Sequence, residues 1–363
     1  MLVTELELKS NLKNYRVYFH AEPDFFSELG ARPHTLFIVD ARVMDLHGGT
    51  TLRALAGKNL IRLEIDEDRK NLDTVQELYA QVMQASPKKN MTVVSIGGGI
   101  TQDLTGFMAS TLYRGVQWVY VPTTLLAQAD SCIGAKTSLN FKTYKNLIGT
   151  FYPPTEVRVY SGFIRTLAEI DFYSGLGEIG KLHINGGAPS VEAFRRDIPR
   201  ILAGEESVLL KAVQQALQIK KSYIEEDEFD TGKRNMLNYG HCFGHAIESA
   251  VAFAIPHGQA VVLGMVLANR VARQRQLLSA ERERYLLEGV LNPIWKTDAQ
   301  PFQLDSPAMV EKIIAGLKQD KKRIGNDLPV VVVDDDLTMV KLTDVKEAEV
   351  AAALQSGWAL AHA

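Results

Sequence analysis

The sequence predicts an α/β domain built on a mostly parallel sheet, followed by an all-α domain. In the first half, short β-branched apolar runs alternate with helical periods, which is typical of a parallel sheet covered by helices. After about residue 170, long helical stretches take over. A chain of 363 residues also exceeds the usual size of one compact core, so two domains are expected. We place the boundary between residues 160 and 175.

The expected strands of the first domain are apolar runs, and a helical period such as 70–85 lies between two of them. Sheets of this kind bind ligands at the carboxyl ends of their strands. The second domain contains one strand-like run, 328–334. The first-domain strands cover 35–40, 60–65, 91–99, 116–122 and 156–161, and the second-domain helices cover roughly 190–226, 236–253, 259–275, 280–289 and 308–318.

Composition and charge exclude several classes of protein. A net charge of -3 gives no general attraction to nucleic acid or to an anionic membrane. Two cysteines are too few for a disulfide framework and fit a reducing compartment. The N-terminus does not read as a signal peptide, and no apolar run approaches the length of a membrane span. We therefore expect a cytoplasmic protein.

A glycine-rich turn, "SIGGGITQDLTGF" (95–107), follows a predicted strand and opens a helix. Glycines allow a ligand to approach the backbone closely, and the free N–H groups of the helix suit a pyrophosphate. The spacing differs from G-x-G-x-x-G, and a tight turn without a ligand is the alternative. Asp40, at a strand end, could accept from ribose hydroxyls or be an ordinary surface aspartate. Glu67 and Lys70 could contact a nucleotide or form a charged loop.

Three histidines lie close together in the second domain. His241 and His245 are four residues apart on one helical face, and His257 follows twelve residues later. A catalytic zinc site usually has three protein ligands and one open position. Glu178, three residues before Lys181 on a helical face, is a candidate carboxylate ligand. The spacing does not decide which histidines bind a metal, and surface or core histidines are the alternative.

Residues 121–154 have little periodicity after Gln128, are expected to form a long ordered loop and contain Lys136, Lys145 and Asn146. Further donors lie elsewhere: Arg114 just before a predicted strand, and Lys220, Arg234 and Asn238 on or near the helix that carries His241 and the helix before it. Together with the glycine turn and the histidines, they indicate a phosphorylated or carboxylated small substrate. Solvated side chains are the alternative for each. The donors are Arg114, Lys136, Lys145, Asn146, Lys220, Arg234 and Asn238.

At these residues the sequence resembles the 3-dehydroquinate synthases of the sugar phosphate cyclase family. The matching stretches occur in family order between residues 95 and 322, and the first 60 residues match loosely. They are "GGGITQDLTGF", "YRGVQWVYVPTTLLAQADSCIGAKTSLN", "KNLIGTFYPP", "GLGEIGK", "RNMLNYGHCFGHAIE", "HGQAVVLGM" and "QDKK".

The resemblance implies a Rossmann-like NAD-binding α/β domain over 1–168 and a mainly helical metal- and substrate-binding domain over 169–363. It implies Glu178, His241 and His257 as ligands of zinc or cobalt, and it assigns His245 to substrate phosphate contact and proton transfer. Arg114 would reach a neighbouring subunit's site, which implies a homodimer. NAD would be held by Asp40, Glu67, Lys70, Gly97, Gly98, Gly99, Asp103, Thr123 and Thr124, and the substrate by Asp130, Lys136, Lys145, Asn146, Lys181, Lys220, Arg234, Asn238 and one of Lys321 and Lys322.

The reaction implied is that of the shikimate pathway to aromatic amino acids. Bound NAD oxidises a ring hydroxyl of 3-deoxy-arabino-heptulosonate 7-phosphate, phosphate leaves, the hydride returns and the opened ring closes to 3-dehydroquinate. The metal acts as a Lewis acid. In the dehydroquinate synthases, positions matching Lys220 and Arg234 bind the substrate carboxylate, which favours a carboxylated substrate here.

Three departures from the family keep alternatives open. This chain reads "LGEIGK" for L-A-E-V-I-K, "HGQ" for H-G-E and "GAKT" for G-G-K-T. They favour, as one alternative, a cyclase of secondary metabolism that uses the 4-amino analogue, sedoheptulose 7-phosphate or glucose 6-phosphate. A metal-dependent oxidoreductase of the glycerol dehydrogenase type is another, although it needs no phosphate-binding lysines. An inactive homologue that binds NAD or a partner is the non-enzymatic alternative.

Overall fold

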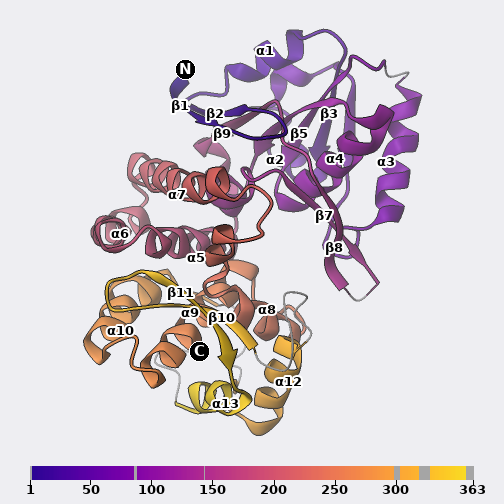
Figure 1. The fold of residues 1–363 in the computed structure, drawn as a ribbon. Coiled ribbons are helices and arrows are strands. Elements are labelled where there is room, and N and C mark those ends of the chain that lie inside the picture. Colours follow the sequence, from indigo (N-terminus) through magenta and orange to yellow (C-terminus); the bar gives the residue numbers. More distant parts are fainter. Residues whose placement is uncertain (1, 86–87, 143, 298–302, 319–327, 357–363) are drawn as a thin grey trace. The chain divides into compact units, whose positions relative to one another are not determined.

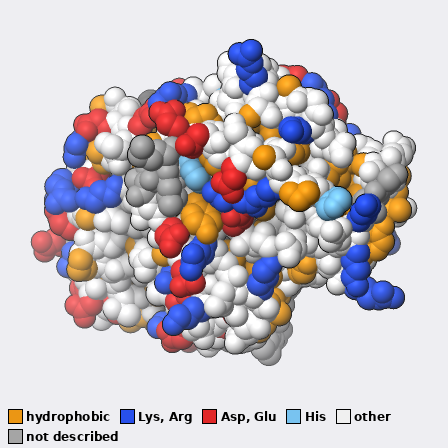
Figure 2. Space-filling view, turned by 90° about the horizontal axis from the view of Figure 1, so that it is seen from above, with side chains coloured by type: hydrophobic (Ala, Val, Ile, Leu, Met, Phe, Trp, Pro, Cys, Tyr) orange, Lys and Arg blue, Asp and Glu red, His pale blue; other side chains and the backbone are white. Residues whose placement is uncertain are grey.

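The computed structural model describes residues 2–85, 88–142, 144–297, 303–318 and 328–356. The chain divides into two compact units, Met1–Leu167 and Ala168–Ala363. Within the described residues, no helix is both long and apolar enough to cross a membrane. Figure 2 shows Lys and Arg side chains interspersed with Asp and Glu over the face that it draws, so that face carries no broad area of one sign.

The first unit is built on a seven-stranded sheet in the order β1-β2-β9-β6-β5-β3-β4 (Figure 1). All neighbouring strands are parallel except β1 and β2, which pair antiparallel. The strands are β1 (Leu2–Leu8), β2 (Tyr15–His20), β3 (Thr35–Asp40), β4 (Leu60–Leu63), β5 (Thr92–Gly97), β6 (Gln117–Pro122) and β9 (Glu156–Tyr160), and the helices are α1 (Phe25–Ala31), α2 (Ala41–His47), α3 (Leu72–Gln84) and α4 (Gly99–Thr111).

All five strands expected from the apolar runs are present as β3, β4, β5, β6 and β9. Strands β1 and β2 were not predicted from the sequence. In "LVTELEL" and "YRVYFH" apolar and polar residues alternate, which is typical of a strand with one face against the core. Exposed Arg16 of β2 lies 3.3 Å from the Glu7 carboxylate of β1. This cross-strand pair of opposite charges supports the pairing of β1 with β2.

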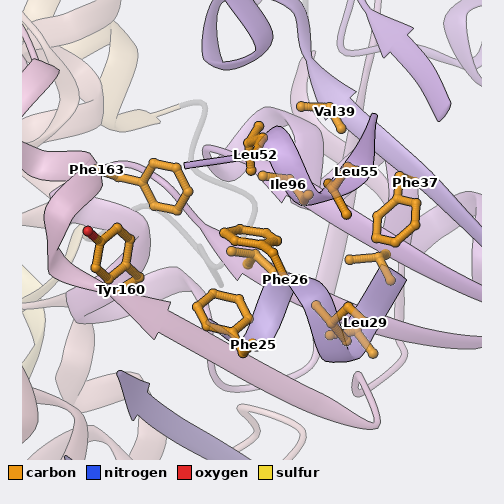
Figure 3. Packing of buried hydrophobic residues seen from close by; sticks show 13 residues of the cluster. Phe25, Phe26, Leu29, Phe37, Val39, Leu52, Leu55, Ile96, Tyr160 and Phe163 are labelled. Atoms are coloured by element: carbon orange, nitrogen blue, oxygen red, sulfur yellow. The ribbon is translucent and has the colours of Figure 1, made fainter. Parts of the chain in front are cut away.

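The core of the first unit lies between the sheet and α1 (Figure 3). Phe25 and Phe26 of α1 pack with Phe163, and strand residues such as Val39 and Ile96 complete the cluster. Burial of each phenylalanine contributes roughly 1.5–3 kcal/mol. Helix α4 packs on the sheet as well, because a Cβ at Gly106 would lie 3.2 Å from the Trp118 ring. The core therefore anchors the strands whose carboxyl ends carry the candidate cofactor residues.

The expected long loop over 121–154 is wrong. The segment forms a π-helix, Ala127–Ser131, and an antiparallel hairpin of β7 (Lys136–Phe141) and β8 (Tyr144–Phe151). In Figure 1 the hairpin extends beyond the sheet. One of the buried positions of β7 is the polar Thr137, and β8 has no buried residue, which explains why apolar periodicity did not reveal the hairpin.

The second unit is mainly helical, as expected, with one added two-stranded sheet, β10 (Leu328–Val333) and β11 (Met339–Val345). Nearly every residue of α9 is buried, which marks it as the central helix of the unit. The expected stretch 190–226 is two helices separated by Ala203–Glu205. The helices are α5 (Glu169–Asn185), α6 (Ala188–Leu202), α7 (Glu206–Glu226), α8 (His241–Ala250), α9 (His257–Gln274), α10 (Ala280–Leu286), α11 (Asn292–Ile294), α12 (Pro307–Lys318) and α13 (Glu347–Gln355).

Candidate active site

The three histidines are brought together by the close packing of α8 and α9. His241 and His257 are the first residues of these two helices. Gly240 has φ +77°, and a Cβ there would lie 2.7 Å from a backbone oxygen of α9. A Cβ at Gly264 would lie 1.9 Å from the Gly240 oxygen. Glycine at both positions therefore allows the backbones of α8 and α9 to touch. The ring centroids of His241 and His257 then lie 5.3 Å apart.

Glu178 of α5 completes a compact set of donor atoms. Its Oε1 lies 3.3 Å from His241 Nε2 and 3.1 Å from His257 Nε2. One nitrogen from each of His241, His245 and His257 lies within 4.8 Å of the others. Donors held about 2.0 Å from a tetrahedral zinc would be roughly 3.3 Å apart, so Glu178, His241 and His257 fit a divalent cation.

The charges around Glu178 explain how a fully buried carboxylate stays ionised. Burial would raise the pKa of Glu178, but the Lys181 ammonium, 2.6 Å from Oε2, and the two imidazoles hold that pKa well below its usual range. Burial would lower the pKa of His257, but hydrogen bonds with Glu178 and Glu248 raise it to about 10. Glu178 and Glu248 therefore favour positive charge at this centre, and a cation bound there would displace the proton of His257.

His245 differs from the other two histidines. It lies one turn after His241 on α8 and is exposed, and its ring centroid is 5.5 Å from that of His257. No Glu178 oxygen contacts His245 among the described ion pairs, which separates it from the other two.

Glu248 is a site residue that the sequence analysis missed. Its Oε2 lies 3.2 Å from Nδ1 of His257, while Nε2 of the same ring faces Glu178. A carboxylate on the second ring nitrogen fixes the tautomer and the direction of a histidine ligand. The available signal was its spacing, because Glu248 follows His241 by two helical turns in "HCFGHAIE".

In the first unit, the glycine turn lies where β5 ends and α4 begins. Gly98 is the N-cap of α4, and a Cβ at Gly98 would lie 3.1 Å from the Thr124 methyl group. The Thr123 N–H donates to the Gly97 carbonyl at 3.0 Å. The structure therefore brings 97–99 and Thr123–Thr124 together at the carboxyl ends of β5 and β6.

Beside this turn, polar residues of α4, β7, β8 and the loop before α3 form one network. Lys70 Nζ lies 2.5 Å from Asp103 Oδ2 and donates to Asn146 Oδ1 at 2.7 Å. Ser138 donates to Asp103 through its backbone N–H and its hydroxyl. Burial raises the pKa of Asp103 above its usual value, although Lys70 opposes that rise. Glu67 lies at the edge of the network, bound to Asn140 and 3.5 Å from Lys145 Nζ.

Asp40 has a local structural contact. Its Oδ1 accepts from the N–H groups of Arg42 and Val43 and so caps α2. Burial raises its pKa. It still lies at the carboxyl end of β3, the strand beside β5, which is the position expected for a ribose contact.

Asp130 lies on the π-helix, which two glutamines hold in place. Gln128 donates to the carbonyls of Pro122 and Tyr160, and Gln102 exchanges two hydrogen bonds with Ser131. Single π turns of this type are frequent at functional sites. Exposed Arg114, with φ +65°, lies in a left-handed turn before β6, and exposed Lys136 begins β7.

The remaining expected substrate contacts lie in the second unit. Lys220 on α7 and Arg234 are buried, and Asn238 donates to the Asn235 carbonyl. The Arg234 backbone is fixed by Asp227, whose carboxylate also accepts from Thr231 and Gly232. Lys321 and Lys322 lie outside the described residues.

A cavity of about 470 Å³ lies in the second unit but contains none of these residues. It is lined by the later turns of α9, by α10 and by the end of α13, including Asn269, Arg270 and Leu287. The candidate site is therefore defined by converging side chains rather than by this cavity.

The fold and the donor set define a protein with a candidate nucleotide-binding unit and a candidate metal centre, and comparisons with known proteins show its family. Residues 60–174 match the family described as 3-dehydroquinate synthase N-terminal, and residues 175–323 match 3-dehydroquinate synthase C-terminal. A 3-dehydroquinate synthase from Streptococcus equi subsp. equi (strain 4047) is 34% identical over 339 residues, covering 90% of this chain and 91% of that protein. The chain belongs to the 3-dehydroquinate synthase family.

Solved structures of sugar phosphate cyclases share the fold. A 2-epi-5-epi-valiolone synthase from Streptomyces hygroscopicus subsp. jinggangensis 5008, with NAD+ and Zn2+ bound, has a TM-score of 0.80 and 26% identity over 96% of this chain and 97% of that one. A 2-deoxy-scyllo-inosose synthase complexed with carbaglucose-6-phosphate, NAD+ and Co2+ has a TM-score of 0.82 and 22% identity over 98% of this chain and 100% of that one. Because both family matches and the 34% identical relative are 3-dehydroquinate synthases, the cyclase interpretation holds over the glycerol dehydrogenase alternative.

Proposed function

We propose that the protein is a 3-dehydroquinate synthase, which converts 3-deoxy-arabino-heptulosonate 7-phosphate to 3-dehydroquinate and eliminates phosphate. The convergence of Glu178, His241 and His257 carries this proposal, because the three donor atoms fit one divalent cation. Lys220 and Arg234 supply two buried cations in the same unit, which favours a carboxylated substrate.

The cofactors are NAD and a zinc or cobalt ion, as in the two related cyclase structures. When bound, the cation would supply Lewis-acid polarisation of a substrate oxygen, and NAD would supply reversible hydride transfer. The NAD-binding part is 1–168, with the glycine turn at its centre. The metal- and substrate-binding part is 169–363, with Glu178, His241 and His257 as the metal ligands.

The other polar residues bind and orient the substrate. Lys181, Lys136 and Lys145 neutralise anionic groups and fix the reacting carbons in place. His245 contacts the leaving phosphate through a ring that Glu178 does not engage, and with Asp130 it handles protons at the reacting centre. Asn146, Asn238 and Lys321 complete the substrate contacts.

The working enzyme is a cytoplasmic homodimer of the shikimate pathway. Its exposed Arg114 would contact the active site of a second copy. Light scattering and sedimentation test the dimer. Arg114→Ala, mixed with an inactive His245→Ala chain, tests whether one copy completes the site of the other.

Phosphate release tests the proposed activity. The enzyme, with NAD and zinc or cobalt, is supplied separately with 3-deoxy-arabino-heptulosonate 7-phosphate, its 4-amino analogue, sedoheptulose 7-phosphate and glucose 6-phosphate. We expect phosphate and 3-dehydroquinate from the first substrate only. Release from another substrate alone would identify a specialised cyclase with the same metal centre. The absence of phosphate release with all four substrates would contradict the proposed activity.

A specialised cyclase is the second candidate function, and the three departures from the family favour it. Gly177 and Gln259 lie beside metal ligands, and Ala135 precedes Lys136. Substrate choice distinguishes the two candidates, because metal and NAD binding would be the same in both.

A further inference from the structure

The two helices that carry Glu178 and His257 cross in backbone contact. A Cβ at Gly177 of α5 would lie 2.2 Å from the Gly258 carbonyl oxygen. A Cβ at Gly258 of α9 would lie 1.8 Å from the Ser174 carbonyl oxygen. The Gly258 N–H also donates to the Ser174 hydroxyl at 3.0 Å. Each glycine is the immediate neighbour of a metal ligand, so this crossing sets the separation of Glu178 and His257.

The buried amide of Gln259 ties the crossing together. Its Nε2 donates to the Tyr173 carbonyl of α5 at 2.6 Å and to the Ile294 carbonyl at 3.1 Å. Its Oε1 accepts from the Lys296 N–H at 2.7 Å. The side chain is 0% exposed. One amide therefore connects the first turn of α9 with α5 and with the end of α11.

Only an amide satisfies all three partners. Tyr173 and Ile294 present carbonyl oxygens, which accept hydrogen bonds, whereas Lys296 presents a donor. An ionised carboxylate has acceptors alone and would face two carbonyl oxygens without a donor. The family residue at this position, glutamate, thus does not fit the close crossing that Gly177 permits in this chain.

We propose that Gln259 is a positioning residue for the metal centre, acting together with Gly177. It holds α9 against α5 and thereby fixes His257 relative to Glu178, which lie 3.1 Å apart. This inference rests on the proposed function, because it concerns the affinity and geometry of the proposed metal site. Gly177 and Gln259, which both differ from the family residues, then act together in the crossing of α5 and α9.

The test compares metal binding by the wild type, Gln259→Glu and a matched control, Gln218→Glu on the exposed side of α7. Dissociation constants for zinc and cobalt come from chelator competition, and the cobalt absorption spectrum reports ligand geometry. We expect the Gln259→Glu dissociation constant to rise about 10- to 100-fold, with an altered cobalt spectrum in folded protein. The control should match the wild type in both measurements.

Other results would overturn either the role of Gln259 or the proposed metal centre. An unchanged dissociation constant and spectrum in folded Gln259→Glu would overturn the inference and leave the proposed function intact. A wild type that binds neither zinc nor cobalt would overturn the proposed metal centre itself. If Gln259→Glu does not fold, Gln259→Met removes the same donor without adding a charge. Wild-type affinity and spectrum in that variant would overturn the inference.

A double-mutant cycle tests the link with Gly177. Gly177→Ala forces α5 and α9 apart, so it also breaks the hydrogen bond from Gln259 to Tyr173. In Gly177→Ala/Gln259→Glu the wider crossing no longer holds the carboxylate against the Tyr173 carbonyl, so we expect the double variant to lose less metal affinity than the product of the two single losses. Multiplicative losses would show that the two residues act separately, which would overturn their proposed cooperation.

Discussion

At the scale of single residues, Glu248 controls how His257 faces the metal centre. The carboxylate lies 3.2 Å from Nδ1, which leaves Nε2 directed at Glu178. We expect Glu248→Gln to raise the zinc dissociation constant about 10- to 100-fold, because a neutral amide holds the ring less firmly. Chelator competition measures the change. Exposed Glu281→Gln is the matched control, and equal affinity in both variants would contradict the role.

The substrate carboxylate provides a second prediction at this scale. Lys220 and Arg234 are 8% and 4% exposed, so charge-assisted bonds from them would form away from bulk water. We expect Lys220→Ala and Arg234→Ala each to lower kcat/KM by roughly 10- to 100-fold, with metal content unchanged.

The control for this pair is Lys211→Ala, a change at an exposed position on the same helix as Lys220. It should keep wild-type kinetics. Unchanged kinetics in both Lys220→Ala and Arg234→Ala would remove the reason for preferring a carboxylated substrate. Loss of metal in either variant would show a structural role instead.

At the scale of elements, the turn that opens β7 is strained. Ala135 has φ +60° where the family has glycine, and it directly precedes Lys136. The left-handed region costs an alanine about 1–2 kcal/mol, and the greater freedom of unfolded glycine offsets about 0.5–1 kcal/mol. We expect Ala135→Gly to raise the free energy of unfolding by roughly 0.5–1 kcal/mol.

Denaturant unfolding measures this gain. Ala80→Gly, on the exposed side of α3, is the control of opposite sign, with an expected loss of about 1 kcal/mol. A destabilised Ala135→Gly variant would mean that the alanine methyl group contributes more by packing than the turn costs.

Strands and long helices were predictable because their apolar residues repeat. The runs that form β3, β5 and β6 are continuous and β-branched, as buried parallel strands require. The β7–β8 hairpin was not predictable from periodicity, since polar residues such as Ser138 and Asn146 face the network around Lys70 rather than a core. Its register depends on partners distant in sequence.

In the candidate site, too, some residues were predictable from sequence spacing, whereas others depend on contacts between distant segments. Spacing placed His241 and His245 on one helix but left the choice of ligands open. In the structure Glu178 contacts His241 and His257, while a nitrogen of His245 lies within 4.8 Å of a nitrogen of each, so the ligand set of Glu178, His241 and His257 stays a prediction. Glu248 and Gln259 act through other residues, and nothing in their spacing shows which carbonyl or imidazole they meet. Such contacts depend on the crossing of α5, α8 and α9.

At the scale of the whole molecule, stability should fall as the pH becomes mildly acidic, and His183 is one cause. This histidine is buried on α5, bonded to Ser190 and stacked on Phe194. Burial lowers its pKa to about 4, whereas an unfolded histidine has a pKa of about 6.5. Between these values the unfolded chain binds more protons, so the free energy of unfolding decreases as the pH falls through this window.

The contribution of His183 is at most roughly 3 kcal/mol, present above pH 6.5 and lost by about pH 4. We expect His183→Gln to be less stable than the wild type at pH 7.5 but to lose less stability on going to pH 5.5. Urea unfolding at both pH values measures the difference. The metal-centre residues are the same in both proteins, so their own titration cancels in the comparison. Exposed His34→Gln should keep the wild-type pH dependence, and an equally steep loss in His183→Gln would show that other groups cause the acid sensitivity.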